Sequence, residues 1–166
     1  LGISRVVYIS SVSVLGLPFS YAPITLHYFP IDEDHPRAPQ DAYALSKTLG
    51  EDIALAFVQR CVGNLSVVSL RLPWIHTPET FKTQLTPLWN DPAGGATNLW
   101  SYIDTRDVGR ACVLSLEADI TGHEEFFVSA KHTFMKEDTA KLVKEFYPEA
   151  KVKTELKDNQ ALIDTS

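Results

Sequence analysis

Tyr43 and Lys47 stand four residues apart in the run Tyr-Ala-Leu-Ser-Lys, and this spacing suits acid–base chemistry. On a helix, residues four apart lie on one face, one turn from each other. A tyrosine hydroxyl ordinarily titrates near about 10, and a neighbouring ammonium group favours the phenolate. Such a tyrosine can act as a general acid or base near neutral pH. The same pattern also occurs as a surface pair on any amphipathic helix, so the surrounding sequence must decide.

Two serines add to the candidate site. Ser10 and Ser11 directly follow a short apolar run that predicts a buried strand over 5–10. Ligands of open α/β sheets bind at the carboxyl ends of the strands, and a serine hydroxyl there can hydrogen-bond a reacting oxygen. The alternative interpretation is that these serines only cap turns.

The elements that must position these residues alternate between strands and helices. Asp41 is typical of the cap of a helix over 42–61, whose apolar face we expect to include Leu45, Leu49, Ile53 and Phe57. Proline-rich residues 15–40 predict a long irregular loop. Further strands are expected over 65–72, 99–103, 124–129 and 151–154, and further helices over 105–118 and 136–146. This alternation predicts an α/β fold with a mostly parallel sheet.

Composition narrows the function classes. The 166 residues are 45% hydrophobic with a net charge of −6, which excludes a disordered chain and a basic nucleic-acid surface. No apolar run approaches the roughly 20 residues needed to cross a membrane. Cys61 and Cys112 match no metal or redox spacing, and the histidines show no metal-ligand pairing. We therefore expect buried thiols, no metal, and a reducing cytoplasmic location.

Five segments, taken in order, resemble the extended short-chain dehydrogenase/reductases, that is, the NAD-dependent epimerase/dehydratase family. They lie in order between residues 7 and 111: residues 7–16, the acidic run 32–34 with Pro36, the Tyr43–Lys47 motif with Glu51, residues 71–75, and residues 102–111. The resemblance implies a Rossmann-like parallel sheet flanked by helices, with a small α/β substrate-binding portion. It also implies an NAD(P)-dependent oxidoreductase or epimerase acting on a hydroxyl or carbonyl group of a small molecule.

The resemblance also implies roles for single residues. Tyr43 would be the acid/base, Lys47 would assist it and hold the nicotinamide ribose, and Ser11 would orient the substrate oxygen. Ser10 would lie near the cofactor. The stretch Pro73, Trp74 and Ile75 would flank the nicotinamide, with Trp74 and His76 in reach of the substrate.

The sequence departs from the family pattern in two ways. Its eight glycines contain no Gly-x-x-Gly-x-x-Gly turn for the pyrophosphate, so we expect a second part of such an enzyme, inactive when isolated. Both NAD and NADP stay open. Trp74 and Trp100 replace an asparagine and an arginine typical of nucleotide-sugar epimerases, which predicts a substrate other than a nucleotide sugar; alternatively, both tryptophans pack in the core.

We expect residues 1–75 to belong to the cofactor-binding domain and 76–166 mostly to the substrate-binding portion, with 99–118 returning to the core domain. The Tyr-Lys helix is the expected homodimer surface, with Ala54 and Val58 facing outward. The alternative function is a non-catalytic binding or regulatory domain on a truncated Rossmann-like fold.

Overall fold

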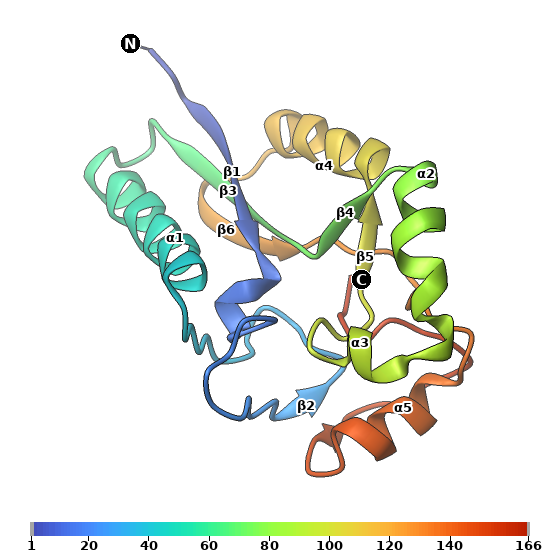
Figure 1. Ribbon diagram of the computed structural model, residues 1–166. Helices are drawn as coiled ribbons and strands as arrows, with labels where there is room; N and C mark the ends of the chain where they lie inside the picture. Colours follow the sequence, from blue (N-terminus) through green and yellow to red (C-terminus); the bar gives the residue numbers. More distant parts are fainter. Residues whose placement is uncertain (1, 166) are drawn as a thin grey trace.

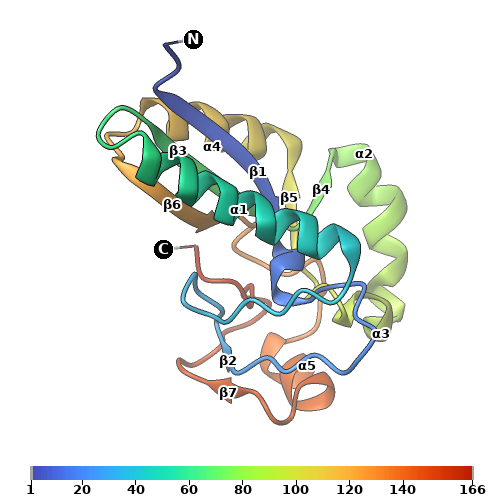
Figure 2. The ribbon, with the colours of Figure 1, turned by 90° about the vertical axis from the view of Figure 1, so that its left-hand side faces the viewer.

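The computed structural model describes residues 2–165, and its centre is a parallel sheet of three strands (Figure 1). These are β1 (Arg5–Ser11), β3 (Ser66–Leu72) and β6 (Gly122–Phe127), in the order β1-β3-β6. The helices α1 (Ala42–Arg60) and α4 (Thr105–Glu117) lie on opposite faces of this sheet, as both ribbon views show (Figure 2). The expected Rossmann-like α/β architecture is therefore confirmed.

A second group of elements lies beyond the carboxyl ends of β1 and β3 (Figure 1). Two short parallel pairs belong to it, β4 (Trp74–His76) with β5 (Tyr102–Asp104) and β2 (Tyr28–Phe29) with β7 (Lys151–Val152). The helical segments are η1 (Val12–Leu15), α2 (Pro78–Thr80), η2 (Phe81–Leu85), η3 (Thr86–Asn90), α3 (Pro92–Ala96) and α5 (Thr139–Phe146). This group forms the small α/β portion that the sequence predicts.

Most predicted elements exist in the structure, and two of the predicted boundaries differ most from it. The strand expected from residue 99 begins only at Tyr102, because Leu99 and Trp100 adopt left-handed backbone angles with φ of 57° and 51°. The helix expected from residue 136 begins at Thr139, where the Asp138 side chain accepts the Lys141 backbone N–H. The proline-rich loop is built into the main core through buried residues such as Leu17, Leu26 and Phe29.

The prediction for the inner face of α1 is wrong. Leu45, Leu49, Ile53 and Phe57 are 48–56% exposed. The buried residues of this helix are Ala44, Thr48, Glu51 and Ala54. Ala54 was expected to face outward and instead packs inward. The small side chains of Ala44, Thr48 and Ala54 let α1 lie close to the sheet. The fourth buried residue, Glu51, is a carboxylate and not an apolar side chain. The period of the apolar residues identifies an apolar stripe, but it does not tell which side meets the sheet.

Helix α4, expected over 105–118, is observed over Thr105–Glu117. Val108, Ala111 and Cys112 pack against the apolar side chains of β3, whereas Leu116 is 45% exposed. Cys61 and Cys112 are free and only half-buried, so the expectation of fully buried thiols is wrong. Within residues 2–165, no helix combines the length and apolarity that crossing a bilayer requires.

Candidate functional site

Six of the predicted site residues line one cavity where β1 and β3 end. Parallel strands present their carboxyl ends at one edge of the sheet, and Ser11 is paired with Leu72 in register at that edge. The cavity holds about 310 Å³. It is lined by Ser10 and Ser11 from the end of β1, Tyr43 from α1, Pro73, Trp74 and Ile75 after β3, and also Ile9, Val12, Pro18, Phe19, Leu72 and Asn98.

The start of α1 places Tyr43 at this cavity. Asp41 caps the helix by accepting the backbone N–H groups of Tyr43 and Ala44 at 2.8 and 3.1 Å. Such a cap satisfies backbone donors that a helix end otherwise leaves unpaired. Tyr43 therefore lies in the first turn, and its side chain is 48% exposed. A half-exposed phenol on a cavity wall can meet a bound molecule.

Lys47 lies beside Tyr43, as the four-residue spacing predicts. Its Nζ is 5.5 Å from the centre of the Tyr43 ring and 5.6 Å from that of Tyr8. The same Nζ donates a 2.8 Å hydrogen bond to the carbonyl oxygen of Ile9. Lys47 is not among the residues that line the cavity, but Ile9 is. Its ammonium group is thus held between the end of β1 and Tyr43.

The two serines have different partners. Ser11 Oγ accepts the backbone N–H of Ser13 at 3.1 Å, which caps η1 and leaves its own hydrogen available. Ser10 Oγ instead donates to Glu51 Oε1 at 2.6 Å. Ser11 therefore both caps a turn and lines the cavity, and the Ser10 hydroxyl serves a buried network.

Glu51 is the centre of that network. Arg71 donates to it through Nε and Nη2, both at 2.9 Å, and Arg37 approaches it at 3.3 Å. Burial disfavours the charged carboxylate, but the hydrogen bonds from Arg71 and Ser10 and the charges of both arginines outweigh it, so the pKa of Glu51 lies below its ordinary value. The network ties α1, β1 and β3 together behind the cavity.

Trp74 lies between two cavities. Its ring stacks on Phe134 at 6.3 Å with an interplanar angle of 9°, and it packs against the main core. Together with Ile75 it also lines a second cavity of about 320 Å³ that contains His76. His76 was expected beside the substrate, but the structure does not place it in the Tyr43 cavity. Burial lowers the pKa of its imidazole, which is therefore neutral at pH 7.

Trp100 follows the core-packing alternative. It is fully buried, its Nε1 donates to the carbonyl oxygen of Pro92 at 2.7 Å, and its ring contacts Phe146 edge-on. Gly95 allows this placement, because a Cβ there would lie 2.5 Å from the Trp100 ring. This tryptophan supports the loop that precedes β5.

Asn98 is the cavity residue that the sequence does not reveal. It lies in the same loop, only 1% exposed, and lines the cavity with Ser11 and Tyr43. No motif or spacing marks it, because its position depends on the left-handed turn at Leu99 and Trp100.

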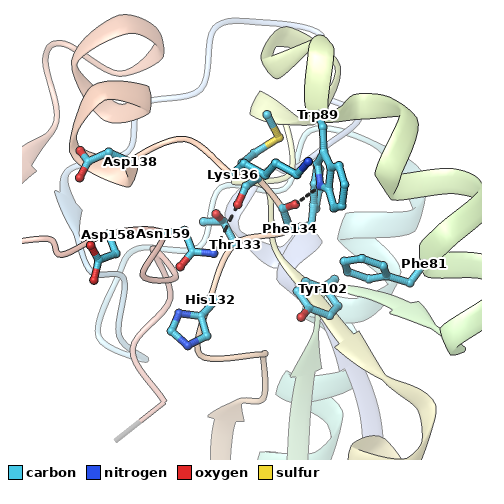
Figure 3. Close-up of a pocket in the computed structure, with 11 residues that line it drawn as sticks. Phe81, Trp89, Tyr102, His132, Thr133, Phe134, Lys136, Asp138, Asp158 and Asn159 are labelled. Atoms are coloured by element: carbon cyan, nitrogen blue, oxygen red, sulfur yellow. Dashed lines mark hydrogen bonds between the residues drawn. The ribbon is translucent and has the colours of Figure 1, made fainter.

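A larger, more open pocket of about 580 Å³ lies in the second group of elements (Figure 3). Phe81, Trp89 and Tyr102 supply aromatic rings, while Asp138 and Asp158 lie toward the opposite side of the view. A 2.6 Å hydrogen bond from Trp89 Nε1 to the carbonyl oxygen of Phe134 connects two of the lining residues. Phe134 thus contacts both this pocket and Trp74. Among residues 2–165, no group of three or more His, Cys, Asp or Glu side chains is placed to hold a metal ion.

Comparison with known proteins supports the resemblance. Residues 1–128 match the family model described as the NAD dependent epimerase/dehydratase family. A search of curated proteins found no match. Among solved structures, MoeE5 in complex with UDP-glucose and NAD is similar with a TM-score of 0.56 at 21% identity, over 99% of this chain and 56% of that one.

Two other solved structures have similar scores. A mutated uronate dehydrogenase matches with a TM-score of 0.53 at 20% identity, over 90% of this chain and 51% of that one. UDP-N-acetylglucosamine 4-epimerase from Bacillus cereus matches with a TM-score of 0.55 at 15% identity, over 93% and 52%. At these identities the likeness shows a shared fold. The chain spans about half the length of these three proteins.

Proposed function

The chain belongs to the NAD-dependent epimerase/dehydratase family, and from this premise we propose that it carries the catalytic half of an NAD(P)-dependent oxidoreductase or epimerase. The observation that carries the proposal is the shared cavity. Tyr43 and Ser11 line it together, and Lys47 lies one helical turn from Tyr43. A phenol, a hydroxyl and an ammonium group in this arrangement can move the proton of a substrate hydroxyl.

In the oxidation direction, Ser11 donates its free hydroxyl hydrogen to the substrate oxygen and so orients it. The Tyr43 phenolate then takes the proton from the substrate hydroxyl. The Lys47 ammonium, 5.5 Å from the centre of the Tyr43 ring, places a positive charge beside the group that moves the proton. Bound NAD supplies the acceptor for the hydride that leaves the same carbon. Reduction runs the same proton transfer in reverse, with the Tyr43 hydroxyl as donor.

The cavity walls fit the nicotinamide end of such a cofactor. Ile9, Pro73 and Ile75 offer apolar surface for a flat ring, next to Tyr43. Lys47 Nζ uses one hydrogen on Ile9, and an ammonium group has three, so it can also reach a ribose hydroxyl. Residues that would hold the pyrophosphate are not among these, and NAD and NADP both stay within the proposal.

We propose a substrate other than a nucleotide sugar. Trp74 presents an aromatic ring to the cavity where nucleotide-sugar epimerases often have asparagine, and Trp100 is buried where they often have arginine. Of the similar structures, one is a mutated uronate dehydrogenase and others are UDP-sugar enzymes. A panel of free sugar acids and UDP-sugars, offered to the full-length protein with NAD, tests this. Turnover of any UDP-sugar would contradict it.

In this proposal, the two groups of elements have different functions, cofactor binding and substrate binding. Residues 1–75 complete the cofactor-binding domain, and 76–166 mostly bind substrate, with 99–118 returning to the core domain. The contact of α4 with β1 supports the return.

We further propose that α1 forms a homodimer contact through its exposed stripe, Leu45, Leu49, Ile53 and Phe57. The stripe is apolar and about half exposed, and such a surface is typical of a site that a protein partner covers. Replacing Leu49 with Glu in the full-length protein should convert a dimer to a monomer in light scattering. An unchanged mass would reject this surface.

Tyr43→Phe tests the catalytic role directly. We expect the variant of the full-length protein to lose at least about 100-fold in turnover while its affinity for NAD stays within twofold. Tyr21→Phe is the matched control, since Tyr21 is 87% exposed and does not line the cavity. If Tyr43→Phe keeps full turnover, the acid/base role is wrong. If the wild-type protein binds NAD or substrate but shows no turnover, the non-catalytic alternative is correct.

A further inference from the structure

The Asn98 side chain has one satisfied and one unsatisfied end. Its Nδ2 donates to the carbonyl oxygen of Ser101 at 2.8 Å. Its Oδ1 is buried and has no hydrogen-bond partner in the part of the chain that the structure describes. Buried acceptors are nearly always paired in folded proteins, so an unpaired one calls for an explanation.

The orientation of the amide follows from its neighbour. A backbone carbonyl can only accept a hydrogen bond, so the amino group must face Ser101 and the oxygen must face away from it. Turning the amide over would set two acceptors against each other. Oδ1 is therefore an acceptor that no group among residues 2–165 satisfies.

The backbone around Asn98 is held in an unfavourable form. Leu99 and Trp100 follow it with φ of 57° and 51°, a region that residues with a Cβ rarely occupy. Ser101 Oγ donates back to the Asn98 carbonyl at 2.6 Å, and the Trp100 backbone N–H donates to Gly95 at 3.0 Å. These contacts make the position of Asn98 rigid. A rigid, strained turn whose cavity-lining residue holds a buried, unpaired acceptor is typical of a ligand-binding position.

We propose that Asn98 determines substrate specificity by accepting, through Oδ1, a hydrogen bond from a second hydroxyl of the substrate. This rests on the proposed function, in which the reacting oxygen of the substrate lies at Ser11 and Tyr43. All three residues line the same cavity, so one small molecule can reach them together. The substrate class is then a polyhydroxylated compound, such as a free sugar or sugar acid. A simple alcohol or aldehyde would leave Oδ1 unpaired.

The experiment compares D-glucuronate with its singly deoxygenated analogues on the full-length protein. Dissociation constants come from titration calorimetry with NAD present, and turnover comes from NADH absorbance. The variants are Asn98→Leu, which removes the acceptor at similar size, and Ser13→Ala as control. Ser13 Oγ is also buried and unpaired among the described residues, but Ser13 does not line the cavity.

In the wild-type protein, we expect one deoxygenated analogue to bind about 10- to 100-fold more weakly than D-glucuronate, since it leaves a buried acceptor unpaired. Asn98→Leu should bring this ratio close to one, and Ser13→Ala should leave it unchanged. Because the ratio is taken within one protein, partial destabilisation does not affect it. If Asn98→Leu does not fold, Asn98→Ala removes the same acceptor and the same ratio is read.

Three results would overturn the inference: the wild-type protein binds no D-glucuronate, it does not distinguish any analogue, or the Asn98 variant keeps the wild-type ratio. Discrimination without turnover would support the role of Asn98 and contradict the proposed oxidoreduction. Turnover with an affinity ratio that Asn98→Leu leaves unchanged would support the proposed oxidoreduction and contradict the role of Asn98.

Discussion

Glu51 and Arg71 join the helix that carries Tyr43 to the strand that ends at the cavity. Two hydrogen bonds of 2.9 Å connect them, from Arg71 Nε and Nη2 to the two carboxylate oxygens. Ser10 at the end of β1 donates to the same carboxylate. One buried carboxylate therefore sets the relative position of α1, β1 and β3, and with it the distance between Tyr43 and Ser11.

Removing the charge of Glu51 should destabilise the full-length protein strongly. In Glu51→Gln, the buried Arg71 keeps its charge and retains only the more distant Glu125 carboxylate, at 3.7 Å, as a counter-ion. Breaking a buried pair of this kind costs about 3 kcal/mol. Asp52→Asn is the matched control, because Asp52 pairs with Arg37 at the surface and contributes less than about 1 kcal/mol. Urea denaturation measures both free energies of unfolding. Equal losses in the two variants would show that the buried network does not stabilise the fold.

His35 should make stability fall in mild acid. Its Nε2 accepts the backbone N–H of His27 at 3.0 Å, which requires a neutral ring with the hydrogen on Nδ1, next to the Pro36 carbonyl. Burial is the largest effect on His35 and lowers its pKa. The hydrogen bond with the Pro36 carbonyl raises this pKa and the charge of His27 lowers it, and the net shift is downward. The unfolded state, which titrates near about 6.5, thus binds more protons.

The free energy of unfolding should therefore decrease as pH falls below about 6.5 and level off below the folded pKa. Denaturation curves at several pH values between about 8 and 5 measure this. In His35→Gln the decrease should be smaller, and the exposed His132→Gln serves as control. A variant that keeps the full wild-type decrease would rule out His35 as its source.

Lys47 should matter for turnover more than for folding. Lys47→Met removes the ammonium group beside Tyr43 and the hydrogen bond to Ile9. We expect turnover to drop by about 100-fold or more and the dissociation constant of NAD to rise, with less than about 1 kcal/mol lost in stability. Steady-state kinetics and thermal denaturation separate these effects. Lys144→Met on the exposed side of α5 is the control, and a matching loss there would point to a general charge effect.

Gly50 should not tolerate a side chain. A Cβ at this position would lie 2.0 Å from the Tyr8 hydroxyl and 2.3 Å from the adjacent ring carbon. In a helix, alanine is ordinarily more stable than glycine by about 1 kcal/mol. Gly50→Ala should nevertheless lower the free energy of unfolding by about 1–3 kcal/mol, because of this overlap. The double variant Gly50→Ala with Tyr8→Leu should lose less than the sum of the single changes. Additive losses in chemical denaturation would reject the overlap as the cause.

The sequence predicts the parallel sheet from the apolar run in β1, the mostly apolar β3 and the alternation of strands with helices. The strand order places Ser11 at the ligand-binding edge of the sheet, and the family resemblance predicts that Tyr43 and Trp74 share that site with it. The wrong prediction for α1 has a physical origin. Leu45, Leu49, Ile53 and Phe57 form a real apolar stripe, but Ala44, Thr48 and Glu51 allow the closer approach to the sheet.

His76 and Asn98 show a second limit. His76 follows Trp74 by two residues, so it lies on the same face of β4 but farther along the strand, where it lines the second cavity with Gln84 and Leu88 instead of the Tyr43 cavity. Asn98 reaches that cavity from a loop because two buried residues after it take left-handed angles. Hydrophobic periodicity contains no information on such a turn.

What the sequence by itself determined is local: the strands, the capped helix, the Tyr43–Lys47 pairing and the family, all of which depend on residue types at short spacing. The tertiary structure alone decided which face of α1 is buried, that Glu51 and Arg71 meet across 20 residues, and that Asn98 completes the cavity wall. These outcomes depend on packing between distant segments, where the shape and charge of one element select the position of another.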